Sequence, residues 1–354
     1  MLLAAMPVTA APIRVATFNA DMSRQGPGLL LRDILSGTDA QTIAVVDVIS
    51  RIAPDILLLN GFDYDLNMVA LQALAGALER RGNPYPHLFA RRPNTGLATG
   101  LDLDGDGRAG GPGDAQGFGR FAGEGGMAVL SRLPIDQAAA QDYSECLWKD
   151  LPESLIDGAR LSSGALAAQR LSTTAHWTVP VALPNGGRLT LLAYHASPPV
   201  FDGPEDRNGR RSHDETAFWL HLLDGDLAWP APRAPFVILG DANLDPVDGD
   251  GRHAAMISLL ADPRLQDPAP RSRGAAEAAR QGGVNALNGG DPALDTVDWP
   301  EDPGPGNLRV DYVLPSADLT VLDAGVWWPE EVALAVAAAK ASRHKLVWVD
   351  IDLP

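Results

Sequence analysis

Short apolar segments that stop abruptly at polar residues place the strongest constraint on how this chain can fold. Runs of this length, rich in Val, Ile and Leu and bounded by Gly, Pro, Asp or Asn, are typical of buried strands. The sequence therefore predicts several buried strands whose ends reach a surface. The segments are residues 13–18, 55–59, 189–193, 236–239, 308–314 and 345–353.

Helical patterns lie between some of these strands. Residues 39–53 and 66–81 repeat apolar side chains at near-helical spacing, and the second run stops at Gly82. Residues 212–215 (Ser-His-Asp-Glu) have the form of a capping box, which predicts a helix that begins there and ends at Gly225. The chain is therefore expected to mix α and β structure.

The length of 354 residues allows one large domain or two ordinary ones, and 45% hydrophobic residues suffice for a substantial core. Residues 91–126 are rich in Gly and Asp, and residues 263–307 are rich in Pro, Gly, Ala and Arg. Neither stretch has the apolar pattern of a separate domain, so both are expected to be long surface loops. Residues 12–354 should then form a single domain.

The charge balance limits the partners of this protein. Asp and Glu outnumber Lys and Arg by 45 to 28, so the formal charge is −17, which disfavours a basic face that grips nucleic acid without specificity. Cys146 is the single cysteine, which excludes an internal disulfide and a cysteine-rich zinc site. The sequence gives no reason to expect a protein partner.

Residues 1–11 (MLLAAMPVTAA) resemble the end of a secretory signal peptide, with a small-x-small site at residues 8–10. The basic segment that usually precedes the apolar part is missing, so an accidental resemblance is the alternative. We expect residues 1–11 to be a signal-peptide remnant and the protein to be secreted or periplasmic. No apolar run approaches the roughly 20 residues that a membrane-spanning helix needs.

The strongest local signal is the segment 236–243 (FVILGDAN). Its apolar strand delivers Asp241 and, two residues later, Asn243 to the same side, and Gly240 permits a close approach of the backbone. A turn held by side-chain hydrogen bonds is the alternative interpretation of Gly-Asp-x-Asn.

Other polar residues at strand ends strengthen the functional interpretation. Taken singly, a His or Asp at the end of a strand is more often a structural residue with its hydrogen bonds satisfied. Together with Asp241 and Asn243, the set in fixed order predicts one shared site. The additional residues are Asn19, Asp21, His195, Asp311 and His344.

This order of motifs, from about residue 13 to the C-terminus, resembles the endonuclease/exonuclease/phosphatase superfamily. The resemblance implies a four-layer α-β-β-α sandwich with two packed, mainly antiparallel sheets. It also implies hydrolysis of phosphodiesters or phosphomonoesters with a divalent metal, Mg²⁺ or Mn²⁺, at a site where strand ends converge. A cation would answer how an acidic protein accepts an anionic substrate.

The resemblance also implies roles for individual residues. His344 would be the base that activates the attacking water, and Asp311 would hold its imidazole. His195 would donate a proton toward the leaving oxygen. Phosphoryl oxygens, water or the metal would be bound by Asn19, Asp241 and Asn243.

Two positions depart from the family pattern. Gly61 occupies the strand end where the family has a metal-binding Glu, and Arg343 replaces the acidic residue of a Ser-Asp-His pattern. Both changes remove negative charge from the expected metal pocket. We expect Asp63, together with Asp21, to take over part of the metal binding. The competing interpretation is that metal affinity and activity are weakened or lost.

A second metal signal lies in the loop 102–114. Asp102, Asp104 and Asp106 stand at positions one, three and five, with Gly at position six, as the start of an EF-hand-type calcium loop requires. Position twelve is Gly113, so the usual bidentate Glu is absent. The pattern predicts a structural calcium site, with a solvated acidic turn as the alternative.

Residues 207–211 form the densest basic patch of the chain. Arg207, Arg210 and Arg211 are candidates for binding the anionic substrate, because guanidinium groups suit phosphate. A solvated turn before a helix is the alternative.

The sequence thus predicts a metal-dependent phosphodiesterase or nuclease-like hydrolase, with a phosphate ester as substrate and nucleic acid among the candidates. A phosphatase acting on small or lipid-derived phosphates is one alternative. A calcium-stabilised binding protein that has lost most of its catalysis is the other.

Overall fold

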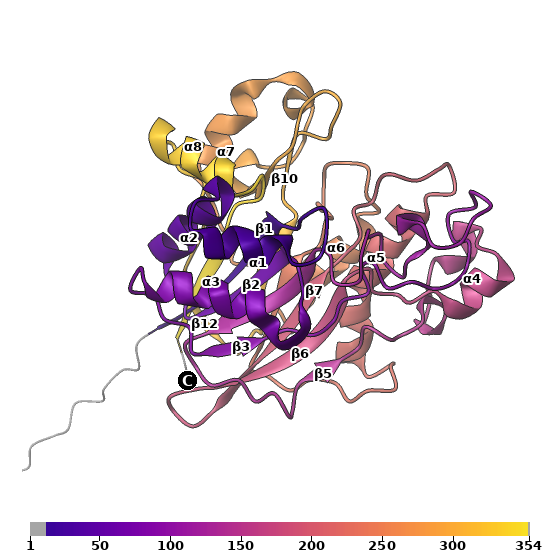
Figure 1. Cartoon of the computed structure of the whole chain (residues 1–354), viewed down its shortest axis with the longest axis horizontal. Helices are drawn as coiled ribbons and strands as arrows, with labels where there is room; N and C mark the ends of the chain where they lie inside the picture. The colour runs from indigo at the N-terminus through magenta and orange to yellow at the C-terminus, as the bar shows by residue number, and fades with distance from the viewer. Residues whose placement is uncertain (1–11, 353–354) are drawn as a thin grey trace, which may run out of the picture.

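Two β-sheets packed face to face form the centre of the molecule (Figure 1). The computed structural model describes residues 12–352, so the expected signal-peptide remnant lies outside the described residues. The six-stranded sheet contains, in spatial order, β12 (Thr320–Val326), β13 (Val347–Asp352), β1 (Ile13–Met22), β2 (Ile56–Phe62), β4 (Gly126–Ser131) and β3 (His87–Phe89). The five-stranded sheet contains β11 (Asp311–Pro315), β8 (Phe236–Asp241), β7 (Arg188–His195), β6 (Ala175–Ala182) and β5 (Gln141–Asp142).

Most neighbouring strands are antiparallel; β1 with β2 and β7 with β8 run parallel. Alternate residues of the strands fill the core between the sheets, among them Val15, Leu58, Trp177 and Val237. Outward-facing residues at the centre of each sheet pack against helices, among them Leu57 and Leu59 in one sheet and Leu192 and Ile238 in the other. The predicted layered sandwich with two mainly antiparallel sheets is therefore confirmed.

Helices cover the outer face of each sheet (Figure 1). The six-stranded sheet packs against α1 (Leu29–Ser36), α2 (Ala40–Ile52) and α3 (Val69–Glu79), with α8 (Val332–Ala341) beside α2. The five-stranded sheet packs against α5 (Arg207–Asp224) and α6 (Ala254–Leu260). No helix in residues 12–352 is both long enough and apolar enough to cross a membrane.

Shorter elements lie in the connecting segments. Those within the two long stretches are η2 (Pro112–Asp114), α7 (Arg273–Ala278), η5 (Ala279–Gln281), η6 (Gly283–Ala286), η7 (Pro292–Leu294), and the hairpin of β9 (Val297–Asp298) and β10 (Asn307–Leu308). The others are η1 (Leu66–Met68), η3 (Trp148–Asp150), η4 (Ile156–Ala159) and α4 (Ser163–Ala168).

The helix that follows β7 begins earlier than the sequence predicts. Its first residue is Arg207, so Ser212 lies inside the helix and does not cap it. The carboxylate of Glu215 accepts hydrogen bonds from the backbone N–H groups of Thr173 (2.5 Å) and Ser197 (2.6 Å), not from the start of the helix. The capping-box prediction is therefore wrong at its start, while the predicted end at Gly225 is confirmed.

An irregularity at the ends of β1 and β2 shapes the edge of the six-stranded sheet. Asn19 pairs with Asn60, and the register shifts after this pair. Asp21 and Gly61 both have a positive φ, +48° and +67°. A Cβ atom on Gly61 would lie 2.5 Å from Oδ1 of Asn19 and 3.2 Å from the backbone nitrogen of Asp21. Glycine is therefore favoured here by its backbone conformation and also by the lack of space.

We predict that Gly61→Ala destabilises the protein more than Gly37→Ala does. Gly37 has a similar φ of +64° with open space around its Cβ position, so its replacement tests backbone strain alone, about 1–2 kcal/mol. At Gly61 the overlap with Asn19 should add roughly 1–3 kcal/mol. Urea unfolding of both variants measures the difference. Equal losses would contradict the steric argument.

Several carboxylates meet where the loop after β8 contacts the loop before η7. Asp248 accepts hydrogen bonds from the backbone N–H groups of Gly289 and Gly290, both 2.8 Å, and thereby joins the two loops. Asp295 lies in the same region. Burial raises the pKa of Asp295 to about 8, and the carboxylates of Asp245 and Asp248 add to the effect. The folded protein therefore retains a proton on Asp295 at neutral pH.

Asp295→Asn should raise the melting temperature by an amount that grows with pH. An unfolded Asp ionises near pH 4, whereas the folded carboxyl ionises near pH 8, so wild-type stability falls as pH rises through this window. Asn removes that loss, and thermal melts at pH 4, 6 and 8 measure it. Asp262→Asn is the control, because hydrogen bonds from Arg264 lower the pKa of Asp262. That variant should lose stability, by an amount that is constant above pH 5. A gain for Asp295→Asn that does not depend on pH would contradict the prediction.

Candidate active site

Strand pairing in the five-stranded sheet brings three of the predicted residues into one row. The parallel pair of β7 and β8 places His195 opposite Asp241, and the antiparallel pair of β8 and β11 places Asp311 opposite Asp241. Gly240 allows the close approach of β7, since a Cβ atom there would lie 1.9 Å from the carbonyl oxygen of Tyr194. The row lies at the ends of β7 and β8 and at the start of β11.

Asp241 connects this row to the other sheet. Its Oδ2 accepts a hydrogen bond from Nδ2 of Asn19 on β1 (2.8 Å) and lies 3.4 Å from Nε2 of His195. Its Oδ1 accepts from the backbone N–H of Asn243 (2.8 Å). The side chain is fully buried, and burial raises its pKa against the opposing effect of His344.

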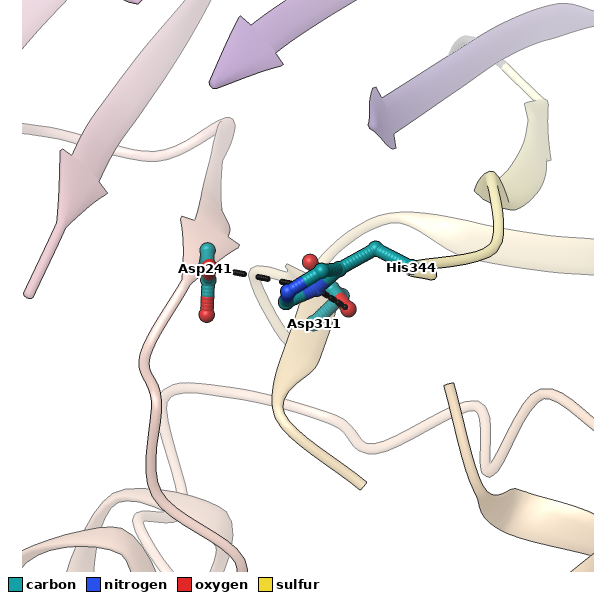
Figure 2. Close-up of side chains that lie close together, drawn as sticks. All are labelled: Asp241, Asp311 and His344. Atoms are coloured by element: carbon teal, nitrogen blue, oxygen red, sulfur yellow. Dashed lines mark hydrogen bonds and ion pairs between the residues drawn. The ribbon is translucent and has the colours of Figure 1, made fainter. Parts of the chain in front are cut away.

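His344 and Asp311 form a buried pair beside Asp241, as Figure 2 shows. Nδ1 of His344 lies 2.9 Å from Oδ2 of Asp311 and 3.9 Å from Oδ2 of Asp241. Oδ2 of Asp311 also accepts a hydrogen bond from the hydroxyl of Thr296 (2.9 Å). Burial alone would lower the pKa of His344, but the carboxylates of Asp311 and Asp241 outweigh it and raise that pKa.

His195 lies in a different electrostatic environment. Burial lowers its pKa, and the carboxylate of Asp241 only partly opposes this effect. Its Nδ1 is buried and has no hydrogen-bond partner in the described part of the chain. The pKa values of the two histidines, His195 and His344, are therefore shifted in opposite directions.

Three further residues hold the site together: Ser342, Lys345 and Thr296. The hydroxyl of Ser342 donates to the carbonyl of Asn19 (2.7 Å) and accepts from the backbone N–H of His344 (3.1 Å). Nζ of Lys345 donates to the carbonyls of Ser342 and Arg343 (3.2 and 2.7 Å). Thr296 is the third. Ser342 and Lys345 stand next to or near His344 in the sequence, which was a signal for their role. No sequence pattern points to Thr296.

The donor set fits a divalent cation. One ligand atom from each of Asp241, Asp311 and His344 lies within 4.8 Å of the others. Oδ1 of Asp311 is buried without a hydrogen-bond partner among residues 12–352, so this carboxylate retains an oxygen for a ligand. Carboxylate oxygens are the ligands that Mg²⁺ and Mn²⁺ prefer.

The structure does not bring Asp63 or Asp21 into this cluster. The two carboxylate oxygens of Asp63 accept hydrogen bonds from the backbone N–H groups of Gly125 and Arg24, both 2.9 Å. Burial raises its pKa to about 6. Asp63 thus holds two loops together, and Asp21 is exposed. The predicted compensation for Gly61 finds no support in this geometry.

The acidic loop 102–114 gathers its carboxylates as expected. Ligand atoms of Asp102, Asp104 and Asp106 lie within 4.8 Å of one another, and all three residues are exposed. Asp102 accepts hydrogen bonds from the backbone of the same loop, at Gly105 (2.7 Å) and Gly107 (3.0 Å). Such turns form with or without an ion. Calcium binding here stays a prediction.

The basic patch 207–211 has a structural role. The guanidinium of Arg211 is buried and donates to backbone carbonyls, including those of Leu171 and Gln116. Arg207 donates to the carbonyl of Leu103 and to Oε1 of Gln169, and Arg210 donates to the carbonyl of Glu205. None of these hydrogen bonds reaches the cluster around Asp241. The guanidinium groups that were predicted to bind substrate therefore form hydrogen bonds within the fold instead.

Known structures share this fold. An endonuclease/exonuclease/phosphatase from Beutenbergia cavernae is 21% identical, with a TM-score of 0.57 over 97% of this chain and 72% of that chain. A mannosyl-6-phosphatase from Bacteroides thetaiotaomicron is 13% identical, with a TM-score of 0.52 over 96% of this chain and all of that chain. Sphingomyelinase C from Streptomyces griseocarneus is 16% identical, with a TM-score of 0.50 over 96% and 99%.

Comparison with curated proteins finds no significant match. The model of the "Endonuclease/Exonuclease/phosphatase family" matches residues 16–344, which spans nearly the whole chain and includes every residue of the cluster. The chain therefore belongs to the endonuclease/exonuclease/phosphatase family.

Proposed function

We propose that this protein hydrolyses phosphate esters, with His344 as the base that activates water. Members of the family act as metal-dependent phosphoesterases. The observation that carries the proposal is the buried pair of His344 and Asp311. A hydrogen bond from Nδ1 to Asp311 fixes the imidazole and leaves Nε2 for the proton of the attacking water.

The other groups would align the substrate and the leaving oxygen. Nδ2 of Asn19 donates to Oδ2 of Asp241, and Nδ2 of Asn243 donates to the carbonyl of Ala196. Each amide NH2 group has a second hydrogen, which could orient phosphoryl oxygens or water. His195 is the proposed proton donor toward the leaving oxygen on grounds of position, since its Nε2 lies 3.4 Å from Oδ2 of Asp241. Burial lowers the pKa of His195, and the carboxylate of Asp241 partly opposes this effect. Proximity and orientation of this kind lower the barrier for attack on an anionic ester.

Asp241 and Asp311 would hold the divalent cation, for which we propose Mg²⁺ or Mn²⁺. When bound, it supplies positive charge to the phosphoryl oxygens. Gly61 contributes no carboxylate, and the space beside it is filled by Asn19. We therefore expect weaker metal affinity than in a site with a third carboxylate.

The substrates we favour are small or lipid-derived phosphate esters. The observation in support is that Arg207 and Arg211, the strongest candidates for a basic surface, donate to groups within the fold. The net charge of −17 adds to this argument, because a nucleic acid needs several phosphate contacts for tight binding. The known phosphatase and sphingomyelinase of this fold have names consistent with such substrates.

We predict that His344→Ala lowers kcat by about 10²- to 10⁴-fold, the usual contribution of a general base. Bis-p-nitrophenyl phosphate and p-nitrophenyl phosphate, each with Mg²⁺, Mn²⁺ or Ca²⁺, provide the assay. His221→Ala is the control, since His221 lies in the last turn of α5, where it contacts Asp226. Retained activity in His344→Ala would sink the assignment of the base. No turnover of wild type with any metal, together with a calcium-dependent rise in melting temperature, would favour the binding-protein alternative.

A second prediction concerns the size of the substrate. The wild-type protein should hydrolyse the nitrophenyl esters while plasmid DNA remains intact at the same enzyme concentration and 150 mM salt. An excess of DNA should not inhibit the small-ester reaction, because the acidic surface repels it. Nicking of the plasmid that weakens steeply with added salt would instead indicate a local basic groove.

A further inference from the structure

Asn60 is buried without hydrogen-bond partners for its side chain. None of its surface is exposed, and within residues 12–352 neither Oδ1 nor Nδ2 has a partner. A buried amide left unpaired costs about 1–3 kcal/mol, and buried polar groups in folded proteins are normally paired with protein or with ordered water, so an unpaired one calls for an explanation such as a bound ion. The side chain therefore has donor and acceptor capacity that the fold itself does not use.

Strand register fixes where Asn60 points. It is paired with Asn19 on the parallel strand β1 and with Met127 on the antiparallel strand β4. Met127 belongs to the core between the sheets, and Asn19 reaches across that core to Asp241. Residues paired on neighbouring strands project to the same face, roughly 5 Å apart. Asn60 thus lies on the inner face of the six-stranded sheet, beside Asn19 at the site.

The groups opposite also retain unused capacity. β1 and β2 pack against β8, which carries Asp241. On the neighbouring β11, Oδ1 of Asp311 is buried without a partner in the described part of the chain. Two oxygen ligands, an amide on one sheet and a carboxylate on the other, therefore border the same end of the core.

No other side chain near the end of β2 can serve this site. Gly61 has no room for a Cβ atom, and both carboxylate oxygens of Asp63 are bonded to the backbone of other loops. Asn60 is what this strand offers in place of a carboxylate.

We propose that Asn60 is a further ligand of the divalent cation, through its amide oxygen. The inference rests on the cation of the proposed function and names a residue that it lacked. An amide oxygen is an accepted ligand for hard cations, although it is weaker than a carboxylate because it carries no charge. The cation would keep more of its positive charge for the phosphate than it does with a carboxylate in the same place.

Calorimetric titration of the full chain with Mn²⁺ tests the proposal. Asn60→Leu should weaken Mn²⁺ binding by about tenfold or more, the scale on which groups that support a metal site act. Asn60→Asp should tighten it. The control is Asn307→Leu, because Asn307 is also buried with both amide atoms unpaired and lies on β10, outside the cluster. That variant should bind Mn²⁺ within twofold of wild type.

Thermal melts separate binding from a structural effect. Both Leu variants should melt higher than wild type without metal, since each removes an unpaired buried amide. Only Asn60→Leu should lose the rise in melting temperature that Mn²⁺ causes. A purely structural Asn60 would give the first result without the second.

Wild-type affinity in Asn60→Leu, or no Mn²⁺ binding by wild type, overturns the inference. If Asn60→Asp fails to fold, Asn60→Leu still decides. Mn²⁺ binding that depends on Asn60 without hydrolysis of either nitrophenyl ester would refute the proposed function alone. Hydrolysis with unchanged Mn²⁺ affinity in Asn60→Leu would refute this inference alone.

Discussion

The buried carboxylate of Asp241 is the interaction on which the site depends. A carboxyl group without solvent exposure is tolerated only with hydrogen bonds or opposite charge around it. Its partners come from distant parts of the chain: Asn19 from the six-stranded sheet, His195 from the next strand, and His344 from the segment before β13. The site can therefore form only when the two sheets have packed. Folding and assembly of the site are one event.

The sequence predicts the parts of this arrangement that depend on local pattern. The strand that ends at Asp241 and the place of His344 before the last strand follow from apolar runs and their polar ends, and the structure has both. Placing His195, Asp241 and Asp311 in one row requires knowledge of the strand order. The family resemblance implied only a layered fold and not that order. Thr296 lies in a long loop and shows no pattern, although its hydroxyl binds Asp311.

Several charged side chains bind groups that are remote in sequence, which spacing and composition do not predict. Glu215 fits a capping box by spacing, yet its carboxylate binds the backbone at Thr173 and Ser197. Arg211 fits a phosphate clamp by composition, yet it binds carbonyls of another loop. The same holds for Asp63, which binds the backbone of two loops. In each case a charged side chain forms hydrogen bonds with backbone groups that irregular segments leave unpaired. Which backbone groups need such a partner is determined only when the loops pack.

This use of charge changes what the acidic composition means for a phosphate substrate. Carboxylates such as Asp63 and Glu215 accept hydrogen bonds from the backbone of loops. The net charge of −17 therefore does not measure the electrostatic potential at the site. There, Asp241 and Asp311 face His344, whose pKa is raised, and Lys345, whose pKa burial lowers to about 8. The carboxylates of Asp241 and Asp311 therefore do not stand alone in the pocket. A divalent cation held by them would add positive charge at the site. If the proposed function holds, the absence of a carboxylate at Gly61 would weaken the hold on the metal and at the same time favour the approach of an anionic ester.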